Sequence, residues 1–234
     1  MHLLALTVSA YALTCVDPDH IEYVTPKVVP TNARLVVAFL GPVPEPLLYD
    51  ADGMLVDAEV LQEAGHLIVV PDAPLAEGDY LLQVRDDLSF PITCDGSDDT
   101  SPPLPPAVDS AVHDEEDSWG YAIDLTEIRV RDVPSGSHIE VELTPPDGGQ
   151  VLLAATKERL IEVGFDACGY GWPRRYDGSL DYDLRVRSVD AAGHPSSWVY
   201  VSPSIDDDEA EEAEPAGGCQ TAPMVDPWGW LRRR

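Results

Sequence analysis

Leu180-Asp181-Tyr182-Asp183-Leu184-Arg185-Val186-Arg187-Ser188-Val189-Asp190-Ala191-Ala192-Gly193-His194-Pro195-Ser196 alternates, over its first half, between apolar and charged side chains. Side chains of a β-strand point to opposite faces with a period of two residues. One face of this strand is therefore expected to be buried away from water, and the other carries only Asp and Arg. Because a dry strand face needs a second sheet to cover it, the stretch predicts a strand of an antiparallel β-sandwich, followed by a turn at Gly193.

Composition extends this prediction to the whole chain. The chain has 234 residues, of which 44% are hydrophobic, a length that fits one or two domains. Its 22 Pro and 17 Gly, against three Phe and three Met, favour many short strands and turns over long helices. The sequence therefore predicts an all-β protein.

A linker divides the chain into two parts. The residues from Asp95 to Pro106 show no apolar periodicity and concentrate Asp, Ser and Pro, which indicates an extended connection. We therefore expect two antiparallel sandwich domains in tandem, at residues 15–95 and 107–205, with a Pro/Asp-rich linker at 96–106.

Short apolar stretches separated by turn residues indicate where the strands lie. In the first domain they lie near residues 29–39, 47–49, 54–61, 67–70, 80–84 and 89–94. In the second domain they lie near 121–131, 138–143, 151–155, 159–163, 180–189 and 198–201. The acidic cluster at 113–117 and the Pro-Pro-Asp-Gly-Gly run at 145–149 are predicted as loops. Tyr182 is similar to the tyrosine corner of sandwich domains, in which a phenol bonds to the preceding backbone.

Two phrases of the first domain, at residues 29–39 and 70–84, resemble the bacterial Ig-like domain of surface-layer (SbsA-type) and envelope proteins. The Asp99-x-x-Pro102-Pro103 sequence is similar to the opening of bacterial fibronectin-like repeats, so the second domain resembles a fibronectin type III or Ig-like module. The resemblance implies two Ig-like sandwiches and a secreted or cell-envelope protein with a structural, adhesive or ligand-presenting role.

The two ends of the chain bear on export. Residues 3–12 are apolar and end in Ala10-Tyr11-Ala12, a small-x-small pattern that marks 1–14 as a candidate secretory signal, although no Lys or Arg precedes the run. A first β-strand at this place is the alternative. Residues 206–234 are expected to be a disordered acidic tail that ends in Arg232 to Arg234. This tail partly resembles the C-terminal sorting tail of myxobacterial envelope proteins, with Gly218-Cys219 before the terminal arginines.

The 12 residues between Cys219 and Arg232 are too few for a membrane crossing, which needs about 20 apolar residues. We therefore expect membrane association only through a processed tail. The tail is either a degenerate sorting signal or a plain disordered end.

Net charge and cysteine spacing limit which partners and metals the chain can bind. With 43 acidic against 14 basic residues, the chain has a formal net charge of −29 and would repel the phosphates of nucleic acids. No two of the four cysteines have the spacing of a zinc site. In an exported chain we expect a disulfide between Cys15 and Cys94, because first and last strands of such sandwiches lie close together. Cys168 and Cys219 either pair or stay free.

No motif predicts catalysis. The chain has no Gly-x-Ser-x-Gly, phosphate-binding glycine loop or His-Glu-x-x-His, so we expect a non-enzymatic protein without catalytic residue, cofactor or metal. The sequence from Asp50 to Gly53 lacks the further ligands of an EF-type calcium loop and is predicted as a turn.

One loop concentrates rings and cations outside any predicted strand, a pattern favoured in recognition surfaces. Its candidate binding residues, for an unknown extracellular or cell-surface glycan or peptide, are Tyr170, Trp172, Arg174, Arg175 and Tyr176. The alternative is a loop that packs over the end of the sandwich. An accessory domain of an extracellular enzyme system is a more distant alternative.

Overall fold

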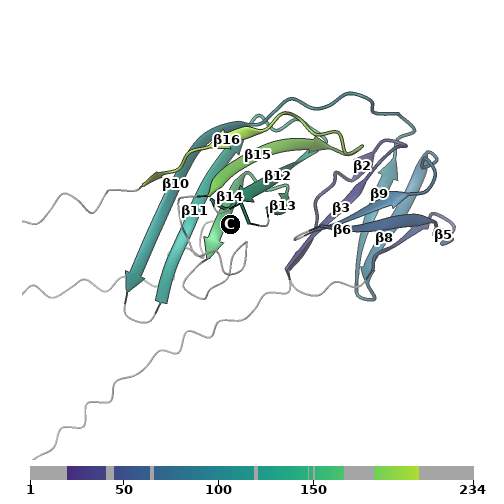
Figure 1. Cartoon of the computed structure of the whole chain (residues 1–234). Helices are drawn as coiled ribbons and strands as arrows, with labels where there is room; N and C mark the ends of the chain where they lie inside the picture. Colours follow the sequence, from purple (N-terminus) through teal and green to yellow (C-terminus); the bar gives the residue numbers. More distant parts are fainter. Residues whose placement is uncertain are drawn as a thin grey trace, which may run out of the picture.

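The structure is a computed structural model, and it describes residues 20–40, 45–63, 66–118, 121–146, 148–149, 151–165 and 182–205. All regular elements of the described residues are β-strands. They form two antiparallel sandwiches in tandem, module one at residues 20–94 and module two at residues 107–205 (Figure 1). The predicted fold class is confirmed. Among these residues no helix has the length and apolarity of a membrane span.

Module one has the strand order of an immunoglobulin-like sandwich. One of its sheets is antiparallel throughout and runs in the order β1 (His20–Tyr23), β3 (Leu35–Leu40), β7 (His66–Pro71), β6 (Ala58–Glu63). The other runs β2 (Val28–Val29), β9 (Leu88–Cys94), β8 (Gly78–Arg85), β4 (Leu47–Asp50), β5 (Leu55–Val56), with β2 parallel to β9. In immunoglobulin terms these are the ABED sheet and the opposing CFG sheet.

The core of module one follows from alternation along these strands. Leu35 and Val37 on β3 point inward and are fully buried against Leu82 on β8 and Ile92 on β9. Core residues stand two apart along a strand, as Tyr80, Leu82 and Val84 do on β8, which is the period of two. Val36, between two core residues of β3, necessarily points out of the sandwich.

A tyrosine corner occurs in module one, where the sequence did not suggest it. Near the start of β8, the hydroxyl of Tyr80 donates a hydrogen bond to the carbonyl of Ala76, four residues upstream, at 3.0 Å. This is the position and the bond that define the motif. Tyr182, the predicted corner residue, lies just before β15 and packs against the core of module two.

Module two consists of two four-stranded sheets. The first runs β14 (Leu160–Phe165), β11 (Tyr121–Arg131), β10 (Ala107–Ser118), β17 (Ser204–Ile205). The second runs β13 (Leu152–Thr156), β12 (Ser137–Thr144), β15 (Asp183–Asp190), β16 (Val199–Val201). Apart from β17, these are strands E, B and A against C′, C, F and G of an Ig-like sandwich.

The acidic cluster at 113–117 is part of a strand, and its prediction as a loop was wrong. The long strand β10 pairs with β11 residue for residue from Ala111, opposite Ile128, to Ser118, opposite Tyr121. Backbone N–H and C=O groups form this ladder, so charged side chains do not prevent it. His113 points inward and is 2% exposed.

The residues from Asp50 to Gly53 form the predicted turn, between the paired strands β4 and β5. The Oδ1 atom of Asp50 accepts hydrogen bonds from the backbone N–H groups of Asp52 and Met54. Gly53 has a φ of +75°, in the left-handed region that favours glycine. The carboxylate of Asp50 is therefore occupied in closing the turn.

Cys94, at the end of β9, is 1% exposed and forms no disulfide with another described residue. Its thiol lies 3.7 Å from the carbonyl of Leu75 as a weak donor. Cys15 lies outside the described residues, so the disulfide expected between these two residues stays a prediction.

Candidate functional site at the module junction

The loop predicted to bind a ligand lies outside the described residues. Tyr170, Trp172, Arg174, Arg175 and Tyr176 all fall in the range 166–181. The same holds for Cys168 and Cys219, and for the end segments 1–14 and 206–234. The candidate site is therefore built from the described residues, whose interactions across the chain gather where the two modules meet.

The first contact of this junction is apolar. Val36 and Ala38, on the outer face of β3, form a cluster with Ile68 on β7 and with Ala155 on β13 of module two. Val36 is 5% exposed and Ala155 is 4% exposed. A side chain on the outer face of a sandwich is this deeply buried only when something covers it. Here the sheet of module two that contains β13 covers it.

The second contact joins a turn of module two to module one. The backbone N–H of Arg34 donates a hydrogen bond to the carbonyl of Ala191 at 2.7 Å, and Ala191 belongs to the hydrophobic core of module one. Gly193, in the same turn, has a φ of +85° and lies against the side chain of Arg34. A Cβ atom at Gly193 would lie 2.4 Å from Cδ of Arg34. The turn therefore requires glycine for its conformation and for the close approach.

The third contact binds the linker to module one. The side chain of Asn32 donates a hydrogen bond to the carbonyl of Asp99 at 2.6 Å and accepts one from its N–H at 3.2 Å. The N–H of Thr31 donates to the carbonyl of Ser97 at 2.7 Å. The start of the linker is thus held on a turn of module one.

An ion pair closes the other side of the junction. Nζ of Lys157, just after β13, lies 2.9 Å from a carboxylate oxygen of Glu22 on β1. The same ammonium group donates to the carbonyl of Tyr23 at 3.5 Å. Lys157 is half exposed, so this pair adds orientation more than stability.

Two buried histidines, His66 on β7 and His138 on β12, come one from each module and are 0% and 1% exposed. Neither ring nitrogen of His138 has a hydrogen-bond partner among the described residues. Burial lowers the pKa of His138 to about 3, and electrostatic interactions with His66 and Arg187 lower it as well. His138 is therefore neutral at physiological pH.

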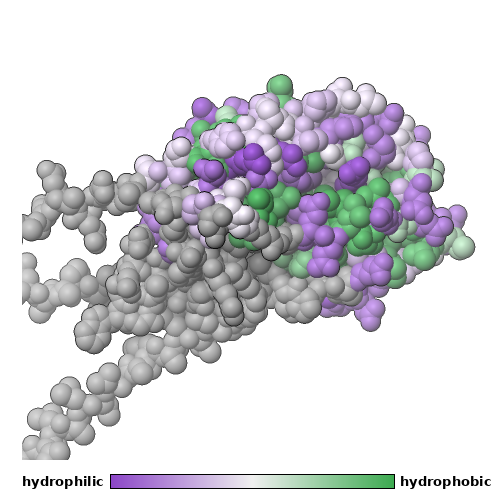
Figure 2. All heavy atoms as spheres, viewed as in Figure 1, coloured by the Kyte–Doolittle hydropathy of each residue, from purple (hydrophilic) through white to green (hydrophobic). Residues whose placement is uncertain are grey.

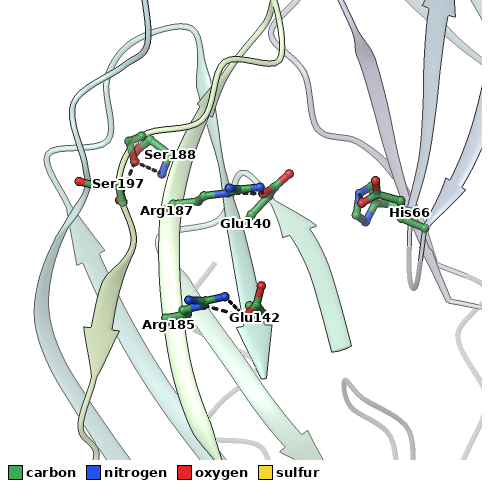
Figure 3. A network of polar contacts seen from close by, with 9 residues as sticks. His66, Glu140, Glu142, Arg185, Arg187, Ser188 and Ser197 are labelled. Carbon is green, nitrogen blue, oxygen red and sulfur yellow. Dashed lines mark hydrogen bonds and ion pairs between the residues drawn. The ribbon is translucent and has the colours of Figure 1, made fainter. Parts of the chain in front are cut away.

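Beside His138, the outer face of the β12–β15 sheet carries a ladder of charges. Nε of Arg187 donates to Glu140 at 2.6 Å, and Nε of Arg185 donates to Glu142 at 2.6 Å. Both guanidinium groups lie over the ring of Trp198, at 4.3 and 4.6 Å from its centroid. Figure 3 shows the two ion pairs, with His66 on the neighbouring module. The ladder links β12 to β15 on the sheet that faces module one.

A line of three polar residues in module two has the residue types of a nucleophile, a base and an acid. Nδ1 of His113 lies 3.0 Å from the hydroxyl of Thr126, and its Nε2 lies 3.7 Å from a carboxylate oxygen of Asp124. However, Thr126 and His113 are each 2% exposed. A nucleophile must meet its substrate, so this line is a set of polar contacts inside the sandwich.

The surface of the described residues is mixed in polarity (Figure 2). Figure 2 shows hydrophilic residues spread over both modules and hydrophobic ones grouped on module one and near its border with module two. A cleft of about 340 Å³ opens at the junction and is lined by residues that include Asn32, Arg34, Asp72 and His194.

The sequence analysis missed the junction, because its residues are ordinary turn and strand residues that lie far apart in the chain. Arg34 and Ala191 are separated by more than 150 positions, and Asn32 and Asp99 by 67. The one available signal is the turn from Asp190 to His194, which contains an Asp, a Gly and a His in close spacing.

Comparisons with known proteins give low similarity. No family model matches the chain, and no curated protein matches it. Among solved structures, three fibronectin-type segments align with most of the chain. The FN1–FN3 domains of chicken CNTN1 are 11% identical, with 80% of this chain and 67% of that chain covered and a TM-score of 0.28. A two-domain fibronectin type III segment of chicken tenascin is 14% identical, covers 78% and 96%, and has a TM-score of 0.25.

The fibronectin(III)-like modules of CbhA from Clostridium thermocellum are 13% identical, cover 85% and 100%, and have a TM-score of 0.24. With TM-scores this low, these likenesses carry no weight for function. The assignment of two Ig-like sandwiches rests on the strand order of the chain itself.

Proposed function

We propose that this chain is a non-enzymatic structural protein of the cell envelope or extracellular space. Its two Ig-like modules form one stiff unit with a structural or ligand-presenting role. The observation that carries this proposal is the junction. A backbone hydrogen bond, an apolar cluster and an ion pair join the two modules, a clamp holds the linker on module one, and together these contacts restrict hinge motion.

The strongly acidic composition supports this role. A net charge of −29 keeps such a protein soluble and unattractive to nucleic acid. The polar line at His113 is buried, so it supports no catalytic role. Secretion, the adhesive role and binding through the loop at 170–176 belong to this proposal as expectations from the sequence.

Residual dipolar couplings of the two modules test the stiffness. A rigid pair gives the same alignment tensor for module one and module two, because both tumble as one body. In Ala155→Glu, a charge would enter the apolar cluster between Val36 and Ile68, and the two tensors are expected to separate. Glu158→Gln, at an exposed position nearby, is the control and should leave them equal.

Different tensors in the wild-type chain would refute a stiff unit. Location is tested separately, by protease treatment of intact source cells followed by mass spectrometry. Release of peptides from residues 20–205 supports an exposed envelope protein, whereas recovery only after lysis contradicts it.

A further inference from the structure

Three metal-ligating side chains converge at the module junction, although the sequence analysis expected no metal. They are Asp99 in the linker and Asp190 and His194 in the turn between β15 and β16. One ligand atom from each lies within 4.8 Å of the others. A bound Zn²⁺ has ligand bonds of about 2.0–2.2 Å to such atoms, so its ligand atoms lie roughly 3–4 Å apart. The three side chains need only a small inward movement to reach this spacing.

The carboxylate of Asp190 is held in place by the backbone. Its Oδ1 atom accepts hydrogen bonds from the N–H groups of Ala192, at 2.9 Å, and His194, at 2.8 Å. Its other oxygen, Oδ2, lies 3.2 Å from Nδ1 of His194. Asp190 is 6% exposed. The two backbone hydrogen bonds orient the carboxylate in advance. Its Oδ2 already faces the imidazole of His194, so a bound ion would replace the direct contact between these two groups.

Asp99 is fixed from the other side. Asn32 of module one holds both the N–H and the carbonyl of Asp99, which places its side chain near the turn. Two carboxylates at this separation repel each other unless a positive charge lies between them. Among the described residues, the side chain that pairs with Asp190 is His194, and neither Lys nor Arg forms an ion pair with Asp99 or Asp190. Arg34 packs against Gly193 without such a pair.

The donor types select the class of ion. An imidazole nitrogen with two carboxylate oxygens suits Zn²⁺ and related transition ions, with remaining positions for water. Ca²⁺ prefers six to eight oxygen ligands, so an imidazole nitrogen is not among its usual ligands. The cleft of about 340 Å³ that His194 borders gives an ion a way in from solvent.

We propose that Asp99, Asp190 and His194 bind a divalent transition cation of the Zn²⁺ class. The ion would tie the linker to the turn of module two, and through Asn32 to module one. This inference goes beyond the structural role proposed above and does not depend on it, because ion binding is measured whether or not the modules are stiff.

The test is titration of the chelator-treated full chain with ZnCl₂ by calorimetry. The variants are Asp99→Asn, Asp190→Asn and His194→Ala. Asn at position 190 keeps an oxygen for the two backbone N–H groups, so the turn is retained while the carboxylate is lost. The exposed neighbour Asp98→Asn is the matched control for Asp99→Asn. We expect each of the three variants to weaken the tightest site about 10- to 100-fold and the control to leave it unchanged.

Nuclear magnetic resonance of the imidazole nitrogens provides a second readout that identifies the ligand. In the wild-type chain, Zn²⁺ should shift a ring nitrogen of His194 at one equivalent. Unchanged Zn²⁺ affinity in Asp190→Asn and His194→Ala would overturn the site. Ca²⁺ binding that is tighter than Zn²⁺ binding and unaffected by His194→Ala would overturn the assigned class of ion.

Discussion

Arg187 places its guanidinium carbon 4.3 Å from the centroid of the Trp198 ring, on the sheet face that turns toward module one. A guanidinium over an indole is a favourable cation–π arrangement. The same guanidinium binds Glu140, which is 7% exposed. The stacked ring thus fixes a cation that a nearly buried carboxylate requires.

Arg187→Ala is expected to destabilise the protein by about 2 kcal/mol, because Glu140 would remain nearly buried without its partner. The loss stays this small because Arg187 itself is partly exposed. Urea denaturation measures the difference. The control is Arg131→Ala, which breaks an exposed ion pair with Asp109 and should cost less than about 1 kcal/mol. Equal losses in both variants would show that the burial of Glu140 is unimportant.

His138 makes stability depend on pH. Its pKa falls from an ordinary 6.5 to about 3 in the folded protein, so only the unfolded chain takes up this proton between these two values. Stability is then complete above about pH 6.5 and decreases as the pH falls toward about 3, with a slope of up to about 1.4 kcal/mol per pH unit.

Denaturation curves at pH 7.5 and pH 5 measure this effect in the wild-type chain and in His138→Phe. The variant should lose about 2 kcal/mol less than the wild type over this range, since its ring takes up no proton. Titration that is the same in both proteins cancels in the comparison. The same pH dependence in the two proteins would exclude a neutral, buried His138.

Gly164 permits the close pairing of β14 with β11. It has a φ of +121°, and a Cβ atom there would lie 1.9 Å from the backbone oxygen of Asp124. Gly164→Ala is therefore expected to cost about 3 kcal/mol or more, since the strands must move apart. Gly136→Ala is the control: its φ is +87° but its Cβ would meet nothing within 4 Å, so it should cost only about 1 kcal/mol. Thermal unfolding of both variants decides between these outcomes.

Strands with regular alternation were predictable from the sequence. The strand expected at 121–131 is β11 with the same bounds, and in its second half the buried Ile128 and Val130 alternate with charged residues. The acidic cluster at 113–117 failed as a loop prediction because strand β10 depends on backbone pairing with β11, which its side chains do not reveal. A tyrosine corner occurs at Tyr80, which the sequence analysis did not single out, since the bond depends on where the upstream carbonyl lies. The corner expected at Tyr182 stays a prediction, because the residues upstream of it lie outside the described ones.

The candidate site was largely unpredictable. Asp190 and His194 stand together in the stretch that identified the sandwich, but Asp99 precedes them by about 90 positions in what the sequence shows only as a linker. His66 and His138 are likewise single histidines in unrelated strands. Both histidine rings are buried in the structure in which the two modules are in contact.

Local order in this chain follows from short-range chemistry: alternation sets strand faces, glycine and aspartate set turns, and proline separates the modules. These features lie within a few residues of one another and can be found in the printed sequence. The packing of β3 on β13, the insertion of Ala191 into module one and the meeting of Asp99 with His194 join residues distant in the chain. Such contacts depend on how two finished sandwiches fit together, and no local pattern encodes that fit.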